Sequence, residues 1–198
     1  MKKTILLGAL LLSAAASYAQ ESRQDVSISG LELLGPTVHG NAITETPSKT
    51  TGILASYRYL LTPHSALEAN YSFAQNTDYF VFGGFPTRNP VHARQQEATV
   101  GYVYGLTFKR FNPFLEAGIG GVFFTPIQEG TYNLSAASNT RIAAMIGGGV
   151  AYEISPSFDL RIQYHGLILK APTFVTPTFN TNSYEVISMP AVGVGYHF

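Results

Sequence analysis

The sequence contains no cysteine and no tryptophan, and only 12% of its residues are charged. The absence of cysteine excludes disulfides, thiol catalysis and thiolate metal sites. The charged share is about half of what a soluble domain usually carries. Basic and acidic residues balance at 12 each, so the chain lacks the basic footprint of a nucleic-acid-binding protein.

Beyond residue 20 the sequence also lacks any apolar run near the roughly 20 residues that a membrane-spanning helix needs. It is nevertheless rich in glycine (19), phenylalanine (13) and tyrosine (12). Few charges without a helix-length apolar run indicate strands with one face in lipid and the other in a polar interior.

The N-terminus has the three parts of a secretory signal peptide. Lys2 and Lys3 are followed by an apolar run and by small residues around Tyr18. We expect residues 1–19 to be cleaved, which leaves one domain over 20–198 and changes the formal charge to 10 − 12 = −2. No cysteine follows the cleavage site, so a lipoprotein anchor is excluded.

Apolar and polar residues alternate with a period of two in eight segments. The period is that of a β-strand with two different faces. The first segment is in phase at Val26 and Ile28 but loses the alternation from Leu31 to Leu33, which suggests a bulge. The segments lie at about 25–34, 52–61, 66–73, 95–106, 113–124, 141–154, 158–168 and 184–198.

The connections between these segments are alternately long and short. Three are short, at 61–65, 107–112 and 155–157, whereas four are long, at 35–51, 74–94, 125–140 and 170–183. Outer-membrane barrels have tight periplasmic turns and long external loops in this order. The fold class is therefore all-β: an eight-stranded antiparallel transmembrane β-barrel, an up-and-down meander, preceded by a cleavable signal peptide.

Two details refine this prediction. The aromatic run from Phe80 to Phe85 could contact a partner, but extension of the strands beyond the membrane is the favoured reading. Pro190 lies within the last strand, where it indicates a bulge or the end of a ladder, because proline donates no hydrogen bond. Aromatic residues near the strand ends indicate interfacial girdles: Tyr57, Tyr59, Tyr71, Phe73, Phe108, Phe111, Phe158 and Phe198.

The polar faces place eight charged residues inside the barrel. An eight-stranded barrel has room only for side chains, so these charges must pair or stay hydrated. A turn at Pro63 sets Arg58 opposite Glu68, and a turn at Pro156 sets Glu153 opposite Asp159, with Arg161 diagonal to Glu153. An ionic plug and a narrow pore both fit this set: Arg58, Glu68, Glu97, Glu116, Arg141, Glu153, Asp159 and Arg161.

The C-terminus resembles the signal that the outer-membrane assembly machinery recognises. The matching residues are Gly193, Val194, Tyr196 and the terminal Phe198, whereas Ala191 stands where a polar residue is usual. The mature chain as a whole resembles the small outer-membrane β-barrels of the OmpA and OmpX types, including stretches 54–59, 67–71 and 113–118. We therefore expect a barrel without the periplasmic peptidoglycan-binding domain that some of these relatives carry.

This resemblance implies a location, the Gram-negative outer membrane, and a set of partners: membrane lipids, lipopolysaccharide, periplasmic chaperones and the assembly machinery. It also implies a monomer without a cofactor. It does not fix a role, because one fold serves many functions. A structural, envelope or surface-interaction role is expected, with a narrow pore for small solutes as the alternative.

Two other classes fit less well. A lipid A-modifying enzyme of the deacylase type resembles a His-x-Ser pattern, and no histidine is followed by serine at that spacing (His39, His64, His92, His165 and His197). A soluble lipocalin-like binder would turn its apolar face inward, and the chain lacks the tryptophan of that family. Histidine and acidic residues form no cluster with the spacing of metal ligands.

Overall fold

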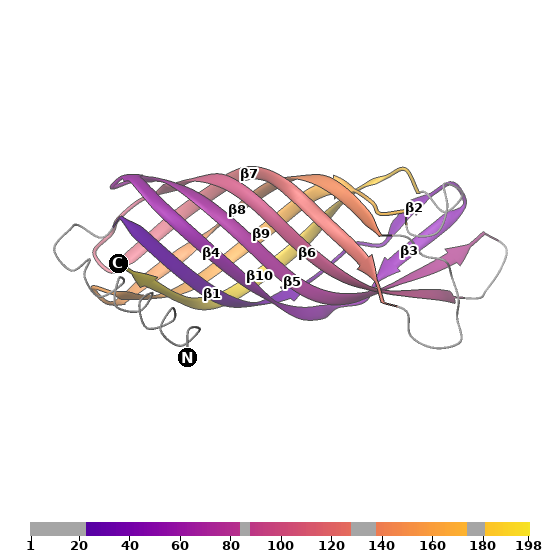
Figure 1. Ribbon diagram of the computed structural model, residues 1–198, viewed down its shortest axis with the longest axis horizontal. Helices are drawn as coiled ribbons and strands as arrows, with labels where there is room; N and C mark the ends of the chain where they lie inside the picture. Colours follow the sequence, from indigo (N-terminus) through magenta and orange to yellow (C-terminus); the bar gives the residue numbers. More distant parts are fainter. Residues whose placement is uncertain (1–22, 84–87, 128–137, 174–180) are drawn as a thin grey trace, which may run out of the picture.

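The computed structural model describes residues 23–83, 88–127, 138–173 and 181–198. Eight long antiparallel strands follow one another around a barrel, and β1 closes it by pairing with β10. Figure 1 shows the C-terminus at one end of the barrel and β2 and β3 at the other. The strands are β1 (Gln24–Leu33), β2 (Val38–Gly40), β3 (Ile43–Pro47), β4 (Thr50–Thr62), β5 (Ser65–Phe82), β6 (Arg88–Gly105), β7 (Phe111–Pro126), β8 (Asn139–Ser155), β9 (Phe158–Lys170) and β10 (Tyr184–His197).

The closed eight-stranded barrel and its three short turns are confirmed, whereas the signal peptide lies outside the described residues. In the described ranges, no helix is long and apolar enough to cross a membrane. The predicted strands were too short at the end with the long connections. Strand β5 continues to Phe82 and remains paired with β6 up to Val81, so this part of the 74–94 connection extends the sheet.

The first long connection was predicted as a loop but contains a hairpin. Strands β2 and β3 pair with each other. Strand β3 also pairs with residues 78–82 of β5, past Ala74, where the pairing of β5 with β4 ends. Asn41 and Ala42 form the turn with φ of 50° and 61°. Two successive positive φ values match the twist of a tight hairpin. The sequence did not reveal this hairpin because its strands are only three and five residues long.

The bulge predicted in β1 is wrong. Residues 24–33 alternate between buried and exposed without interruption, and Leu31 and Leu33 face the interior while Glu32 faces outward. The alternation of polar and apolar residues is lost in the sequence because the inward-facing residues of β1 change from polar to apolar along the strand. Inward residues are polar from Asp25 to Ser29 and apolar from Leu31 onward.

Pro190 lies in register opposite Tyr164 of β9. On its other side, the ladder between β10 and β1 stops at Ala191 and resumes only as an isolated bridge between Leu34 and Ser188. The missing N–H of proline thus coincides with an interruption of pairing on one side, without a bulge.

The outward face carries an apolar band. About 11 residues of each tilted strand cross the hydrocarbon core of a membrane. Counted over 11 residues from Ser65, Phe158 and Tyr196 near the short turns, the crossing segments end near residue 75 in β5, 168 in β9 and 186 in β10. Exposed aromatic side chains mark the end with the short turns: Tyr59, Tyr104, Phe108, Phe111 and Phe158.

Glycines allow the strands to approach closely on the inner face. A Cβ added to Gly118 would lie 2.2 Å from the carbonyl oxygen of Val100, and one added to Gly120 would lie 2.2 Å from that of Ala98. Both collisions are with backbone atoms of β6, which rotation of a side chain cannot relieve. A Cβ at Gly30, on the outward face of β1, would meet nothing within 4 Å.

We therefore expect Gly118→Ala to destabilise the barrel by about 1–3 kcal/mol, the usual cost of overpacking. Gly30→Ala is the matched control and should leave stability within about 0.5 kcal/mol. Urea unfolding of the protein refolded into lipid vesicles measures both. Equal midpoints for the two variants would contradict the close approach of β6 and β7.

Candidate functional site

The inward charges nearest the short turns form one connected ionic network. Arg58 Nε donates to Glu68 Oε2, and the two residues are register partners across the Pro63 turn, as predicted. Arg161 Nη2 lies 3.0 Å from Asp159 Oδ2 and 3.3 Å from Asp25 Oδ1. Asp25 also lies 3.9 Å from Arg58 Nε, so it joins the two arginines.

The register sets Glu153 opposite Asp159, as predicted, but Arg161, although diagonal to Glu153, forms no ion pair with it. The ion pairs of Arg161 run to Asp159 and Asp25 instead. His197 Nε2 also lies 2.9 Å from Asp159 Oδ2. Glu153 is only half-buried, so its charge retains access to water, whereas Asp159 is 2% exposed and depends on its partners.

A second network lies deeper in the barrel around His165. Its Nε2 is 2.7 Å from Glu97 Oε1 and its Nδ1 is 3.0 Å from Glu116 Oε1. Imidazole donates from both nitrogens only in its cationic form. Ser72 and Thr99 donate further hydrogen bonds to Glu97. The histidine is thus held between two carboxylates on β6 and β7, and it is 0% exposed.

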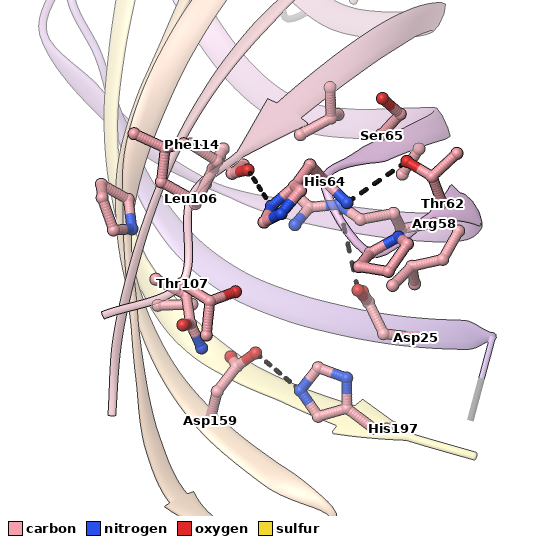
Figure 2. Close-up of a pocket in the computed structure, with 18 of the residues that line it drawn as sticks. Asp25, Arg58, Thr62, His64, Ser65, Leu106, Thr107, Phe114, Asp159 and His197 are labelled. Carbon is pink, nitrogen blue, oxygen red and sulfur yellow. Dashed lines mark hydrogen bonds and ion pairs between the residues drawn. The ribbon is translucent and has the colours of Figure 1, made fainter. Parts of the chain in front are cut away.

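A cavity of about 150 Å³ opens at the end with the short turns. Figure 2 shows Asp25, Arg58, Phe114, Asp159 and His197 among the residues that line it. The guanidinium of Arg58 lies 4.6 Å from the centre of the Phe114 ring. This cation–π contact stabilises an arginine that is withdrawn from water. The side chains of the ionic network therefore form part of the cavity wall.

An apolar layer separates these networks from the opposite end of the barrel. Its members include Leu54, Met145, Leu167 and Met189, each at most 1% exposed. They come from β4, β8, β9 and β10, so they converge from opposite walls. Side chains therefore fill the middle of the barrel, as an eight-stranded barrel allows.

Three buried carboxylates lie beyond the apolar layer, at the end that carries the β2–β3 hairpin. They are Glu45 of β3, Asp78 of β5 and Glu185 of β10. Burial, with the charges of Asp78 and Glu185, raises the pKa of Glu45 to about 9. Burial, with the charge of Glu185, raises the pKa of Asp78 to about 7. Burial alone raises the pKa of Glu185 to about 7.

The structure places the predicted charges on the inner face, but not in one site. Glu97 and Glu116 meet at His165, and Arg58, Glu68, Asp159 and Arg161 form the network at the short turns. Arg141 stands apart near the other end, where its Nη2 donates to Thr173 Oγ1.

Sequence reasoning missed Asp25, Glu45, Asp78 and Glu185 among the buried charges. Extending the period-two phase would have found Asp78 from Glu68 and Glu185 from Gly193, because each pair differs by an even number of positions. Asp25 follows from its neighbour Val26, because adjacent residues of a strand face opposite sides and Val26 faces outward. Glu45 had no such signal, since its hairpin was not predicted.

The predicted assembly residues lie on the last strand. Val194 faces outward and Gly193 faces inward, where an added Cβ would meet the carbonyl oxygen of Ile28 at 2.1 Å. The ring of Tyr196 lies 5.1 Å from that of Phe158 and 6.0 Å from that of Phe198. The backbone N–H of Phe198 donates to Gln24, which fixes the terminus to β1.

No group of three histidine or acidic residues is arranged to hold a metal ion within the described ranges. The His165 cluster contains one imidazole and two carboxylates, but each carboxylate already lies within hydrogen-bond distance of a ring nitrogen of that imidazole.

The family model for the outer membrane protein beta-barrel domain matches residues 4–198. No curated protein matches the chain. Among solved structures, OprG from Pseudomonas aeruginosa is similar with a TM-score of 0.67 and 11% identity, over 90% of this chain and 97% of that chain. Neisserial surface protein A has a TM-score of 0.65 and 14% identity, over 89% and 98%. Ail from Yersinia pestis, solved with the heparin analogue sucrose octasulfate, has a TM-score of 0.58 and 13% identity, over 90% and 100%.

A substitution in the ionic network tests how much the network contributes to the free energy of unfolding. Arg58→Ala removes the partner of Glu68, which is 2% exposed, and leaves that carboxylate buried without its cation. Breaking a buried pair from one side costs about 3–5 kcal/mol. Arg94→Ala, on the exposed outward face of β6, is the matched control with an expected cost below about 0.5 kcal/mol. An Arg58→Ala urea midpoint that equals the wild-type value would count against the pair.

Proposed function

The chain belongs to the outer membrane protein beta-barrel domain family, and from this premise we propose that it is a sealed barrel with a structural, envelope or surface-contact role. The alternative is a narrow pore for small solutes. Both roles use the same fold, so the state of the barrel interior decides between them.

The observation that carries the proposal is the apolar layer across the barrel. Leu54 and Leu167 are each 0% exposed, and Met145 and Met189 are buried beside them in the same cluster. An ion that passed this level would lose its hydration shell without gaining a polar partner, which costs many kcal/mol. The ionic networks on the side of the short turns add fixed charge pairs that fill the remaining section.

The surface-contact role is supported by the part of the barrel beyond the apolar band. The upper ends of β5 and β6 and the β2–β3 hairpin extend past the crossing segments, at the end opposite the C-terminus (Figure 1). With periplasmic short turns, this extension is on the cell exterior. It carries exposed polar side chains such as His39, Thr46, His92 and Arg94.

The proposal includes no catalysis and no soluble ligand binding. The ring nitrogens of His165 contact carboxylates and not a hydroxyl, so they do not activate a serine. A lipocalin-like binder would carry its apolar face inside, whereas this barrel presents its apolar band outward.

The partners proposed for this barrel are lipids and lipopolysaccharide around the band, with periplasmic chaperones and the assembly machinery before insertion. The segment Gly193–Phe198 supports recognition by that machinery, and signal-peptide cleavage after residue 19 precedes it. We further propose that the barrel is a monomer, since all eight strands pair within one chain.

Planar-bilayer recording tests the sealed interior. The wild-type protein should show no discrete conductance steps, because the apolar layer offers ions no hydrated path. The double variant Leu54→Ala/Leu167→Ala, which shortens two side chains in that layer, should conduct in discrete steps.

Leu67→Ala/Ile162→Ala is the matched control, with two apolar truncations on the exposed outward face. It should remain closed. If the wild-type protein and the control both show regular conductance steps of similar size, the sealed barrel is wrong and the narrow pore is the better proposal.

A further inference from the structure

Three carboxylates meet where the β2–β3 hairpin packs onto the barrel mouth. Glu45, Asp78 and Glu185 are 2%, 4% and 7% exposed, and they come from β3, β5 and β10. With the amides Asn76 and Gln95 they line a cavity of about 10 Å³, which has room for about one water molecule.

Among the residues that the structure describes, none supplies a cation to these carboxylates in that cavity. The described lining contains no arginine, lysine or histidine. On β8 the nearest inward charge along the strand is Arg141, which donates to Thr173. On β6 it is Glu97, which His165 binds. The inward side chains that β1, β4, β7 and β9 present near this level are apolar: Leu31, Leu33, Leu54, Val122, Phe124, Leu167 and Leu169.

Their hydrogen bonds are also few. Asn76 Nδ2 donates to Asp78 Oδ1 at 2.9 Å. Glu45 Oε2 and Gln95 Nε2 are buried without a hydrogen-bond partner. A buried carboxylate without a cation or a full set of donors is strongly disfavoured, and neighbouring like charges add to the cost. A bound proton removes that cost.

The hairpin is the element best placed to respond to this charge. Strand β3 is attached to the barrel through five register pairs with β5. Two backbone hydrogen bonds flank them, from Ser48 N–H to Thr77 O and from Gly83 N–H to Ala42 O. Glu45 lies in the centre of β3 and faces the other two carboxylates, so repulsion there pushes directly on the hairpin.

We propose that Glu45, Asp78 and Glu185 form a proton-dependent latch, which holds the β2–β3 hairpin on the barrel mouth when protonated and releases it when ionised. The latch goes beyond the proposed function and does not depend on the sealed interior, because it concerns the mouth that carries the β2–β3 hairpin and not the apolar layer. It would let the pH outside the membrane alter the shape of the surface that the barrel presents.

The direction of the pH dependence follows from the shifts. Each carboxyl has a higher pKa in the closed mouth than in water, so the closed form binds more protons. Its stability is fully present below the ordinary pKa of a carboxyl and falls as the pH rises. Most of the loss from Asp78 and Glu185 is complete near pH 7, and that from Glu45 near pH 9.

Because the chain has no cysteine, a pair of spin labels can be introduced cleanly. Thr46→Cys on β3 and Ala98→Cys on β6 lie on exposed positions, one on the hairpin and one in the band. Pulsed electron resonance in lipid nanodiscs should give one narrow distance at about pH 5. At about pH 10 a longer and broader distribution should dominate.

In this labelled background, Glu45→Gln and Asp78→Asn each replace a carboxyl with a neutral side chain of nearly the same shape. Either variant should keep the narrow distance to higher pH than the parent does. If one variant fails to fold, the other still tests the latch. Glu32→Gln, an exposed outward carboxylate on β1, is the matched control and should behave as the parent.

Two results would overturn the latch. The first is a distance distribution that is the same at both pH values in the parent. The second is a loss of the narrow distance at the same pH in Glu45→Gln, in Asp78→Asn and in the parent, since the opening would then not depend on these carboxyl groups.

Discussion

Closure of an eight-stranded barrel is the constraint on which the rest of this structure depends. It pairs every long strand on both sides and leaves an interior with room only for side chains. Inward charges are thereby removed from water and must find partners in the same small volume. The pairs of Arg58 with Glu68 and of Arg161 with Asp159, and the position of His165 between two carboxylates, are consequences of that closure.

The same constraint explains how the interior is divided along its axis. Near the short turns, cations and carboxylates are both present and pair. In the middle, buried leucine and methionine side chains pack together. At the far mouth, carboxylates lie together in a cavity whose described lining contains no cation, and in the proposed latch proton binding takes the place of pairing. Three solutions to the cost of burial therefore occur in one barrel, each set by the residues available at that depth.

Closure also determines where glycine is needed. The strands coil strongly around a narrow interior, which brings the inner face of one strand against the backbone of the next. Gly118 and Gly120 of β7 face β6 at distances that leave no room for a Cβ. The abundance of glycine and the scarcity of charge in the sequence are thus two results of one geometry. Both features can be read from the composition, whereas the close approach of the strands that explains them requires the structure.

The sequence by itself determined the strand count of the barrel, the two faces of the long strands after β1, the short turns and the Arg58–Glu68 pair. Period-two alternation and turn length are local properties that a chain carries without its fold. The tertiary structure alone decided which partner Arg161 takes, because Asp25 reaches it only when β1 closes on β10. It also decided the hairpin at the mouth and the meeting of Glu45 with Glu185. These residues are 140 positions apart, so only the closed barrel brings them together.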